Sequence, residues 1–278
     1  MRWHRQPDLR SPVVIAGFEG WNDAGDAATS AVRALGSLWN ADPFADIDPE
    51  EFYDFTANRP QVRLVEGRTR AIEWPPNGFW SATIPGTDVD VVLLQGTEPG
   101  LRWRTFCDQV LAVVRALDAR LVVTLGALLA EVPHTRPVRV IGTAQDDELI
   151  ERLRLHRSTY EGPTGIVGVL HDALRQRGVP SLSLWAAVPT YVSGPASPVA
   201  ALALVRRVAE LLAVSVEVDT LESEGSAYLQ RIDEVVADDD DLSEFLERLE
   251  EAYDEEESAG RTDPADLIAE VERFLRDQ

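Results

Sequence analysis

The chain has 278 residues, enough for one large domain or one domain with an appendage, and 45% of them are hydrophobic, as in ordinary soluble globular proteins. The net charge of -22 argues against a nucleic acid partner, and the lack of an apolar run of ~18 residues argues against a membrane span. One cysteine, Cys107, excludes an intramolecular disulfide and a cysteine-based zinc site, and all 26 basic residues are arginine, which excludes lysine chemistry.

The strands expected in the first two thirds of the chain are short apolar runs, most of them ending near a glycine or proline. They span residues 12–17, 89–94, 121–125, 138–141 and 182–187, and a hairpin around Gly67 joins 62–66 to 68–74. We predict that Gly126 and Gly142 end their strands.

Helical spacing of apolar residues alternates with these runs. One helix begins after Asn22 or Asp23, either of which suits a helix cap, and continues to about Leu38. Further helices are expected around Phe106 to Leu117, at 146–156, around Ile166 to Leu174, and at 199–213. The alternation predicts an α/β fold with a mostly parallel sheet and helices on both faces.

The negative charge is concentrated at the C-terminal end. Residues 217–278 contain 23 acidic residues and 5 arginines, a net charge of -18. We therefore divide the chain into an α/β body, residues 1–216, and an acidic helical extension, residues 217–278. Helices are expected at 221–236 and 242–253, the latter with an apolar stripe, followed by a solvated linker at 255–260 and a last helix capped by Asp263. The stripes predict packing on the body or on a second subunit.

Two loops after predicted strands carry carboxylates beside glycine and tryptophan. The first loop contains Glu19 and Asp23, with Trp21 and Asn22 between them. Its glycines permit close approach of a ligand, but a tight turn with a helix cap explains the same residues. The second loop contains Glu98, a candidate general base.

The tryptophan of the second loop, Trp103, is a candidate site wall. The alternative for this loop is a structural ion pair of Glu98 with an arginine and a core position for Trp103.

The remaining candidates follow later strands. His134 is the best acid–base candidate, and Arg136, two residues on, has the geometry to hold a carboxylate. Glu161 precedes a helix in a Gly-Pro turn, and Tyr191 follows the last strand of the body. For each of them a purely structural role is the alternative. Nucleophile elbow, zinc-protease and EF-hand patterns are absent from the sequence, so no metal and no cofactor is expected.

Taken together, the loops carry six ordered motifs. They are GFEGWNDAGDAA at 17–28, DPEEFYDF at 48–55, GTEP at 96–99 followed by Trp103, LGALLAEVPHTRP at 125–137, YEGPTGI at 160–166 and LWAAVPTYV at 184–192. The chain resembles a bacterial, actinobacterial member of the proteasome assembly chaperone 2 family over residues 12–215. The resemblance implies a phosphorylase/hydrolase-like α/β body, a homo-oligomer such as a trimer, and a protein partner such as a proteasome subunit.

Three possibilities stay open at this point, of which the last is a structural relic of a phosphorylase-like fold that keeps the turns without the chemistry. The first is a cytoplasmic, non-enzymatic interaction or assembly protein, in which the acidic extension attracts a basic partner. The second is a small-ligand-binding protein or an enzyme, such as a carboxylate–amine ligase, with a crevice at Glu19, Asp23, Glu98, His134, Arg136 and Tyr191.

Overall fold

The computed structural model describes residues 1–258 except 159, 193 and 195. Eight strands form one sheet in the order β1-β3-β6-β7-β2-β8-β10-β9. Their bounds are β1 Arg2–Trp3, β2 Val13–Glu19, β3 Asp42–Asp46, β6 Asn77–Thr83, β7 Asp90–Thr97, β8 Leu121–Ala130, β9 Val140–Ala144 and β10 Ser181–Pro189. The helices are α1 Ala27–Leu38, α2 Trp103–Ala116, α3 Asp147–Leu153, α4 Ile166–Arg175, α5 Pro198–Leu212, α6 Asp219–Ala237 and α7 Asp240–Ser258. None of the helices among these residues is both long and apolar enough to span a membrane.

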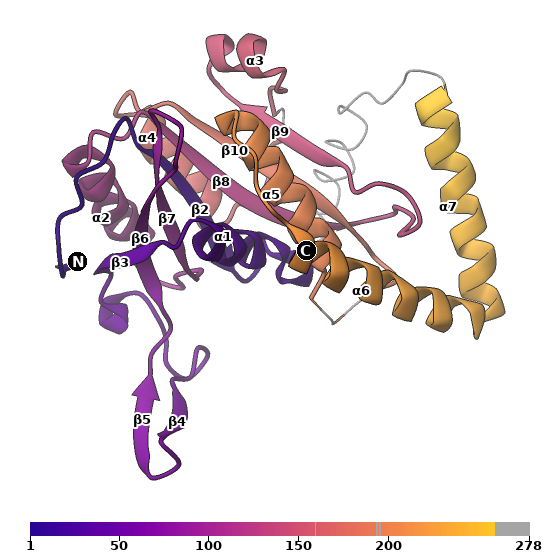
Figure 1. The fold of residues 1–278 in the computed structure, drawn as a ribbon, viewed down its shortest axis with the longest axis horizontal. Coiled ribbons are helices and arrows are strands. Elements are labelled where there is room, and N and C mark those ends of the chain that lie inside the picture. The colour runs from indigo at the N-terminus through magenta and orange to yellow at the C-terminus, as the bar shows by residue number, and fades with distance from the viewer. Residues whose placement is uncertain (159, 193, 195, 259–278) are drawn as a thin grey trace.

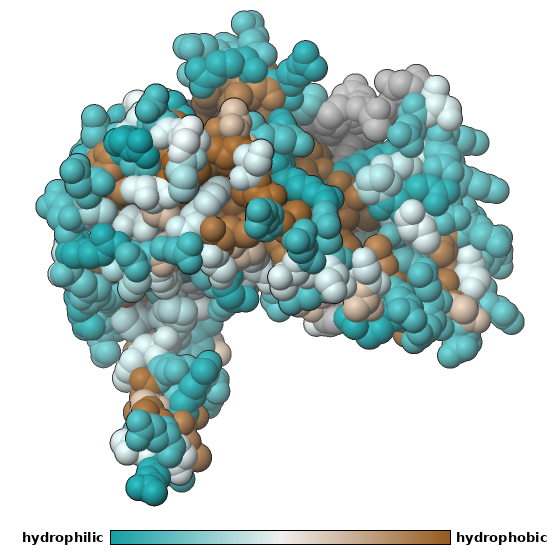
Figure 2. Space-filling view, in the orientation of Figure 1, coloured by the Kyte–Doolittle hydropathy of each residue, from teal (hydrophilic) through white to brown (hydrophobic). Residues whose placement is uncertain are grey.

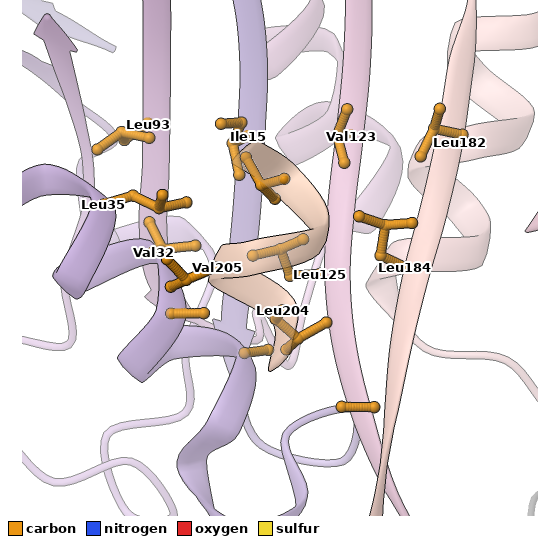
Figure 3. Close-up of a cluster of buried hydrophobic side chains, with 14 of the residues drawn as sticks. Ile15, Val32, Leu35, Leu93, Val123, Leu125, Leu182, Leu184, Leu204 and Val205 are labelled. Carbon is orange, nitrogen blue, oxygen red and sulfur yellow. The ribbon is translucent and has the colours of Figure 1, made fainter. Parts of the chain in front are cut away.

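The fold is α/β with helices on both faces of the sheet, as the alternating pattern predicts (Figure 1). The four central strands β7, β2, β8 and β10 are parallel, and every outer pairing is antiparallel. Two apolar cores sit on opposite faces of the sheet. One joins α1 and α5 to the sheet through residues such as Ile15, Leu35 and Leu204 (Figure 3), and the other joins α2 and α4.

Several predicted boundaries are wrong, for a common reason. Gly126 does not end its strand, because β8 continues to Ala130 and the missing side chain makes room for the Trp185 indole, which would lie 2.5 Å from a Cβ at that position. Strand β9 begins at Val140 and runs past Gly142. The helix expected at 146–156 is shorter, since α3 ends at Leu153. In each case a contact distant in sequence outweighs the local signal.

Three strands and two acidic segments differ from the prediction or lie beyond it. Strands β1, β3 and β6 were not predicted. The segment 255–258 is not a linker, because α7 continues to Ser258. The helix predicted from Asp263 lies outside the described residues. The prediction that Cys107 is a buried apolar position is confirmed, and burial raises the pKa of its thiol to about 12.

The predicted hairpin is confirmed as β4 Gln61–Val65 and β5 Thr69–Glu73, joined through Gly67. It forms its own two-stranded sheet and projects from the body as an arm (Figure 1). At the other end of the chain, α6 packs on α5, and α7 turns back along the edge of the body. Buried Leu249 and Tyr253 confirm the apolar stripe of α7.

Candidate functional site

Asp23 holds the first helix in place. Its Oδ1 accepts hydrogen bonds from the backbone amides of Ala28, at 2.6 Å, and Thr29, at 3.3 Å, while Oδ2 accepts the Thr29 hydroxyl. The carboxylate thus caps α1 across an intervening 3₁₀ turn, Ala24–Asp26, and the predicted cap is confirmed. Burial raises the pKa of Asp23 to about 6.

Glu98 caps a second helix. Its Oε1 accepts the amide of Ile166, the first residue of α4, at 2.7 Å, and its own amide donates to the Glu19 carbonyl at 2.8 Å. Gly165 allows this approach, because a Cβ there would lie 2.6 Å from both Glu98 Oε1 and Asn22 Nδ2. Three of the six motifs therefore meet at one helix terminus, where a negative charge is stabilised by the helix dipole.

The side chains around Glu19 form a hydrogen-bonded group with the 48–55 motif. Thr97 donates its hydroxyl to Glu19 Oε2 at 3.1 Å, and the Tyr53 hydroxyl donates to the Thr97 carbonyl at 2.5 Å. The Asn77 amide donates to the same carbonyl at 3.1 Å. Trp103 donates its indole N–H to the Pro99 carbonyl and packs against the α2–α4 core. Glu19, Glu98 and Trp103 thus fix the geometry of the strand ends.

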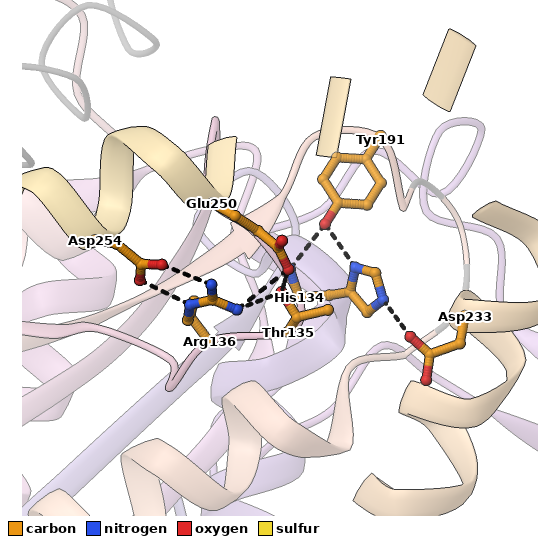
Figure 4. Close-up of polar contacts among 7 residues, drawn as sticks. All are labelled: His134, Thr135, Arg136, Tyr191, Asp233, Glu250 and Asp254. Carbon is orange, nitrogen blue, oxygen red and sulfur yellow. Dashed lines mark hydrogen bonds and ion pairs between the residues drawn. The ribbon is translucent and has the colours of Figure 1, made fainter. Parts of the chain in front are cut away.

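His134 belongs to a different group, which lies against α6 and α7 (Figure 4). The Tyr191 hydroxyl accepts the backbone amide of His134 and lies 2.7 Å from its Nδ1, while Nε2 lies 3.0 Å from Asp233 Oδ1. Burial raises the pKa of Tyr191 to about 12, so its hydroxyl keeps its proton and donates it to Nδ1. Nε2–H then donates to Asp233, and a neutral imidazole satisfies every contact.

The His134 side chain is 2% exposed, so an external substrate has no access to its ring nitrogens. The arrangement of carboxylate, imidazole and phenol has the components of a proton relay, with Asp233 exposed at one end and the His134 imidazole buried between its partners. Its observed role is to join the loop after β8 to the extension. Among the described residues, no group of three His, Cys, Asp or Glu side chains has a geometry that could hold a metal ion.

Arg136 holds α7 to the same loop. Its guanidinium makes a bidentate ion pair with Asp254, with Nε–Oδ1 at 2.8 Å and Nη2–Oδ2 at 2.7 Å, and its Nη1 reaches Glu250 at 3.1 Å. Hydrogen bonding to Arg136 lowers the pKa of Asp254. Arg139 adds an ion pair with Glu256 at 2.6 Å. Thus part of the acidic surface of the extension is neutralised within the chain.

The candidates from the sequence therefore occupy several separate environments. Glu19 and Glu98 lie together at the ends of β2 and β7, while His134, Arg136 and Tyr191 contact the extension. Trp21 and Asn22 line a cavity on the α4 face of the sheet. Glu161 is exposed on the loop before α4.

Sequence reasoning missed His171, which lies inside α4 and contacts three hydroxyl groups. Its Nε2 lies 2.9 Å from Thr124 Oγ1 and 2.8 Å from Ser183 Oγ, and its Nδ1 lies 2.8 Å from Ser181 Oγ. Burial lowers its pKa to about 4. The alternating hydroxyls of the strand, Ser181 and Ser183, were the only signal in the sequence.

Replacing Arg136 by alanine is expected to loosen α7 without unfolding the body. Amide hydrogen exchange in α7 should become several-fold faster, because the bidentate pair with Asp254 is lost, while the thermal midpoint changes little. High salt should act in the same direction on the unaltered chain. Arg248→Ala is the control, since Arg248 pairs with Glu244 within α7 itself. Equal exchange rates in Arg136→Ala and the unaltered chain would contradict the assignment.

The comparisons with known proteins point to one family. The model described as PAC2 family matches residues 17–236. A PAC2 family protein from Streptomyces avermitilis is 45% identical, with 84% of this chain and 99% of that chain covered at a TM-score of 0.79. A proteasome-assembly chaperone homologue from Mycobacterium tuberculosis is 48% identical, with the same shares covered and a TM-score of 0.77.

A more distant structure shares the fold. PbaA from Pyrococcus furiosus, an archaeal homologue of proteasome-assembly chaperone, is 20% identical to this chain. The match covers 89% of this chain and 97% of PbaA at a TM-score of 0.59. No match is found among curated proteins. Helix α7 lies beyond the residues that the family model matches.

Proposed function

This chain belongs to the PAC2 family, and from that premise we propose that it is a non-enzymatic assembly protein whose partner is a protein complex such as the proteasome. The observation that carries the proposal is the projecting β4–β5 arm. The contacts of His134 and Arg136 give it further support, because they join the extension to the body and leave His134 closed to an external substrate.

The arm exposes large apolar side chains, whereas in the body most side chains of this kind are buried. Val62, Leu64 and Ile72 are 59%, 63% and 58% exposed. Val62 pairs with Ile72 and Leu64 with Arg70, so these three apolar side chains share one face of the hairpin. Figure 2 shows the apolar residues on the arm, set apart from the body. A two-stranded hairpin is marginally stable alone, and such a face is stabilised when a partner covers it.

The charge of the arm is opposite to that of the chain. Residues 59–74 contain four arginines and two glutamates, whereas the whole chain carries a net charge of -22. An acidic surface with an apolar groove or an open strand edge is therefore the partner surface that the arm fits best. In this proposal the partner binds through the arm, and the acidic extension remains docked on the body.

The proposal is tested with proteasome α-subunits from the same organism. We expect the full chain to co-elute with them in size-exclusion chromatography, and a Val62→Thr/Leu64→Thr/Ile72→Thr variant to lose at least tenfold in affinity by calorimetry. Threonine keeps the strand propensity of the hairpin while removing most of its apolar face.

Val235→Thr is the matched control, since Val235 is 62% exposed on α6, away from the arm. Equal binding by the triple variant would overturn the role of the arm, and lack of any association would overturn the proteasome as partner. If the triple variant forms a smaller oligomer than the unaltered chain when no partner is present, the arm joins copies of this chain instead.

A further inference from the structure

The α4 face of the sheet is polar where β8, β10 and β9 run side by side. On the opposite face these strands present Val123, Leu125, Leu182 and Leu184 to the α1–α5 core. Toward α4, the alternate positions are Thr124 and Gly126 on β8, Ser181, Ser183 and Trp185 on β10, and Thr143 on β9. A sheet face that packs only against a helix is ordinarily apolar, so these residue types need another explanation.

A cavity of about 740 Å³ opens on this polar face. Its wall includes Trp21 and Asn22 from the loop after β2, Thr143 from β9, and Ser183 and Trp185 from β10. The volume falls within the ~300–1,000 Å³ of small-molecule sites in proteins. It is distinct from the small cleft next to His134, which α6 and α7 border.

The floor of the cavity is a connected polar network. His171 contacts the hydroxyls of Ser181 and Ser183, and Thr124 Oγ1 lies 2.8 Å from Ser183 Oγ. The three hydroxyls can donate or accept by rotating their protons, and a neutral imidazole by changing its tautomer, so the floor adapts to either kind of group on a ligand.

A second observation points to a missing partner. Asn22 is 4% exposed, and its Nδ2 makes no hydrogen bond with any described residue. A buried amide without an acceptor costs free energy, about 1–3 kcal/mol in proteins generally, so it calls for an explanation such as a bound water or ligand. Asn22 forms part of the cavity wall, and a turn of its side chain would bring the amide to an acceptor on a ligand there.

The aromatic side chains define the shape of that ligand. The Trp185 indole is packed against Gly126, where a Cβ would lie 2.5 Å from the ring, so its position in the wall is fixed. Trp21 forms another part of the wall, and Tyr160 stands at the loop before α4. Indole and phenol faces favour stacking with flat rings.

We propose that this cavity binds a small planar heteroaromatic molecule with hydrogen-bonding atoms on its edge, the class that includes nucleobases and nicotinamide. The indoles contact the ring faces, and the His171–hydroxyl network and the Asn22 amide bind its polar edge. This site is independent of the β4–β5 arm.

The test is isothermal titration of the full chain with adenine, uracil and nicotinamide, three rings that differ in edge chemistry. At least one is expected to bind, and Thr143→Trp, which places an indole in the cavity from the neighbouring strand, is expected to weaken it at least tenfold. Val235→Trp, which places the same indole on the exposed surface of α6 outside the cavity, is the control and should bind within about twofold of the unaltered chain.

Trp185→Leu provides a second variant should Thr143→Trp fail to fold. It removes one stacking face and should also weaken binding at least tenfold, with a smaller ligand-induced change in tryptophan fluorescence, because Trp21 remains in the wall. Binding that is unchanged in both variants would place the ring elsewhere and overturn the proposal. Absence of heat for all three rings at millimolar concentration would overturn it as well.

Discussion

Acidification from pH 7 to pH 4 is expected to lower the free energy of unfolding by about 2–3 kcal/mol through one imidazole, that of His171. Burial lowers the pKa of His171 to about 4, whereas an ordinary histidine titrates near 6.5. Above pH 6.5 the imidazole is neutral in both the folded and the unfolded chain. Between about 6.5 and 4, only the unfolded chain takes up the proton, so stability falls as the pH falls.

The expected magnitude is limited by two features. His171 keeps partial exposure where it borders the cavity, so the full shift of its pKa is an upper bound on the cost. Asp23 acts in the opposite direction, because its pKa of about 6 lies above that of an unfolded aspartate, and the folded chain gains stability as the pH falls from 6 toward 4. The net contribution of these two buried groups is therefore the difference between their opposite effects.

The contributions of His171 and Asp23 are separated by urea denaturation of the unaltered chain and of His171→Gln at pH 7 and pH 4.5. Glutamine retains hydrogen-bonding groups for Ser181 and Ser183 but does not titrate. We expect the variant to be less stable at pH 7 and to lose less stability than the unaltered chain on acidification. An equal loss of stability on acidification in both proteins would show that His171 does not cause the pH dependence.

Replacing Gly96 by alanine is expected to lower the free energy of unfolding by about 3 kcal/mol, near the upper end of what overpacking usually costs. Gly96 lies in β7 opposite Asn77 of β6. An added Cβ would overlap with the Asn77 side chain and with the backbone carbonyl of Pro76, which cannot rotate away. Displacement of Asn77 would also break its hydrogen bond to the Thr97 carbonyl.

Gly100 provides the matched control, since it lies four residues later, in the loop after β7. A Cβ on Gly100 would meet no atom within 4 Å, so Gly100→Ala should change stability by less than about 0.5 kcal/mol. Both variants are compared by chemical denaturation at pH 7. Equal midpoints for Gly96→Ala and Gly100→Ala would contradict the close packing at the end of β7.

Local patterns in the sequence were sufficient for several elements. The strand β2 was predicted from its continuous apolar run, which is buried on both faces, and α4 from the helical spacing of its buried face. The hairpin was predicted from the turn at Gly67, since its strands are exposed. Strands β3 and β6 were not predicted. They contain Pro43, Asn77 and Gly78, which weaken the local strand signal, and their pairing with each other is specified only once the chain is folded.

The candidate functional residues divide in the same way, into those whose role local sequence predicts and those whose partners are set only by the fold. Motif order was sufficient for the family, and residue chemistry limited the helix cap to Asn22 or Asp23, since a helix cap acts within a few residues of the chain. The structure shows that the cap is Asp23. The environment of His134 was not predictable, because its partner Asp233 lies 99 positions later, and Arg136 pairs with Asp254 118 positions later. The sequence by itself therefore determined the helices, the central strands and the family. Only the tertiary structure decided which polar groups meet, because hydrogen bonds and ion pairs depend on distance in space, and residues far apart in the chain leave no periodic signal of their contact.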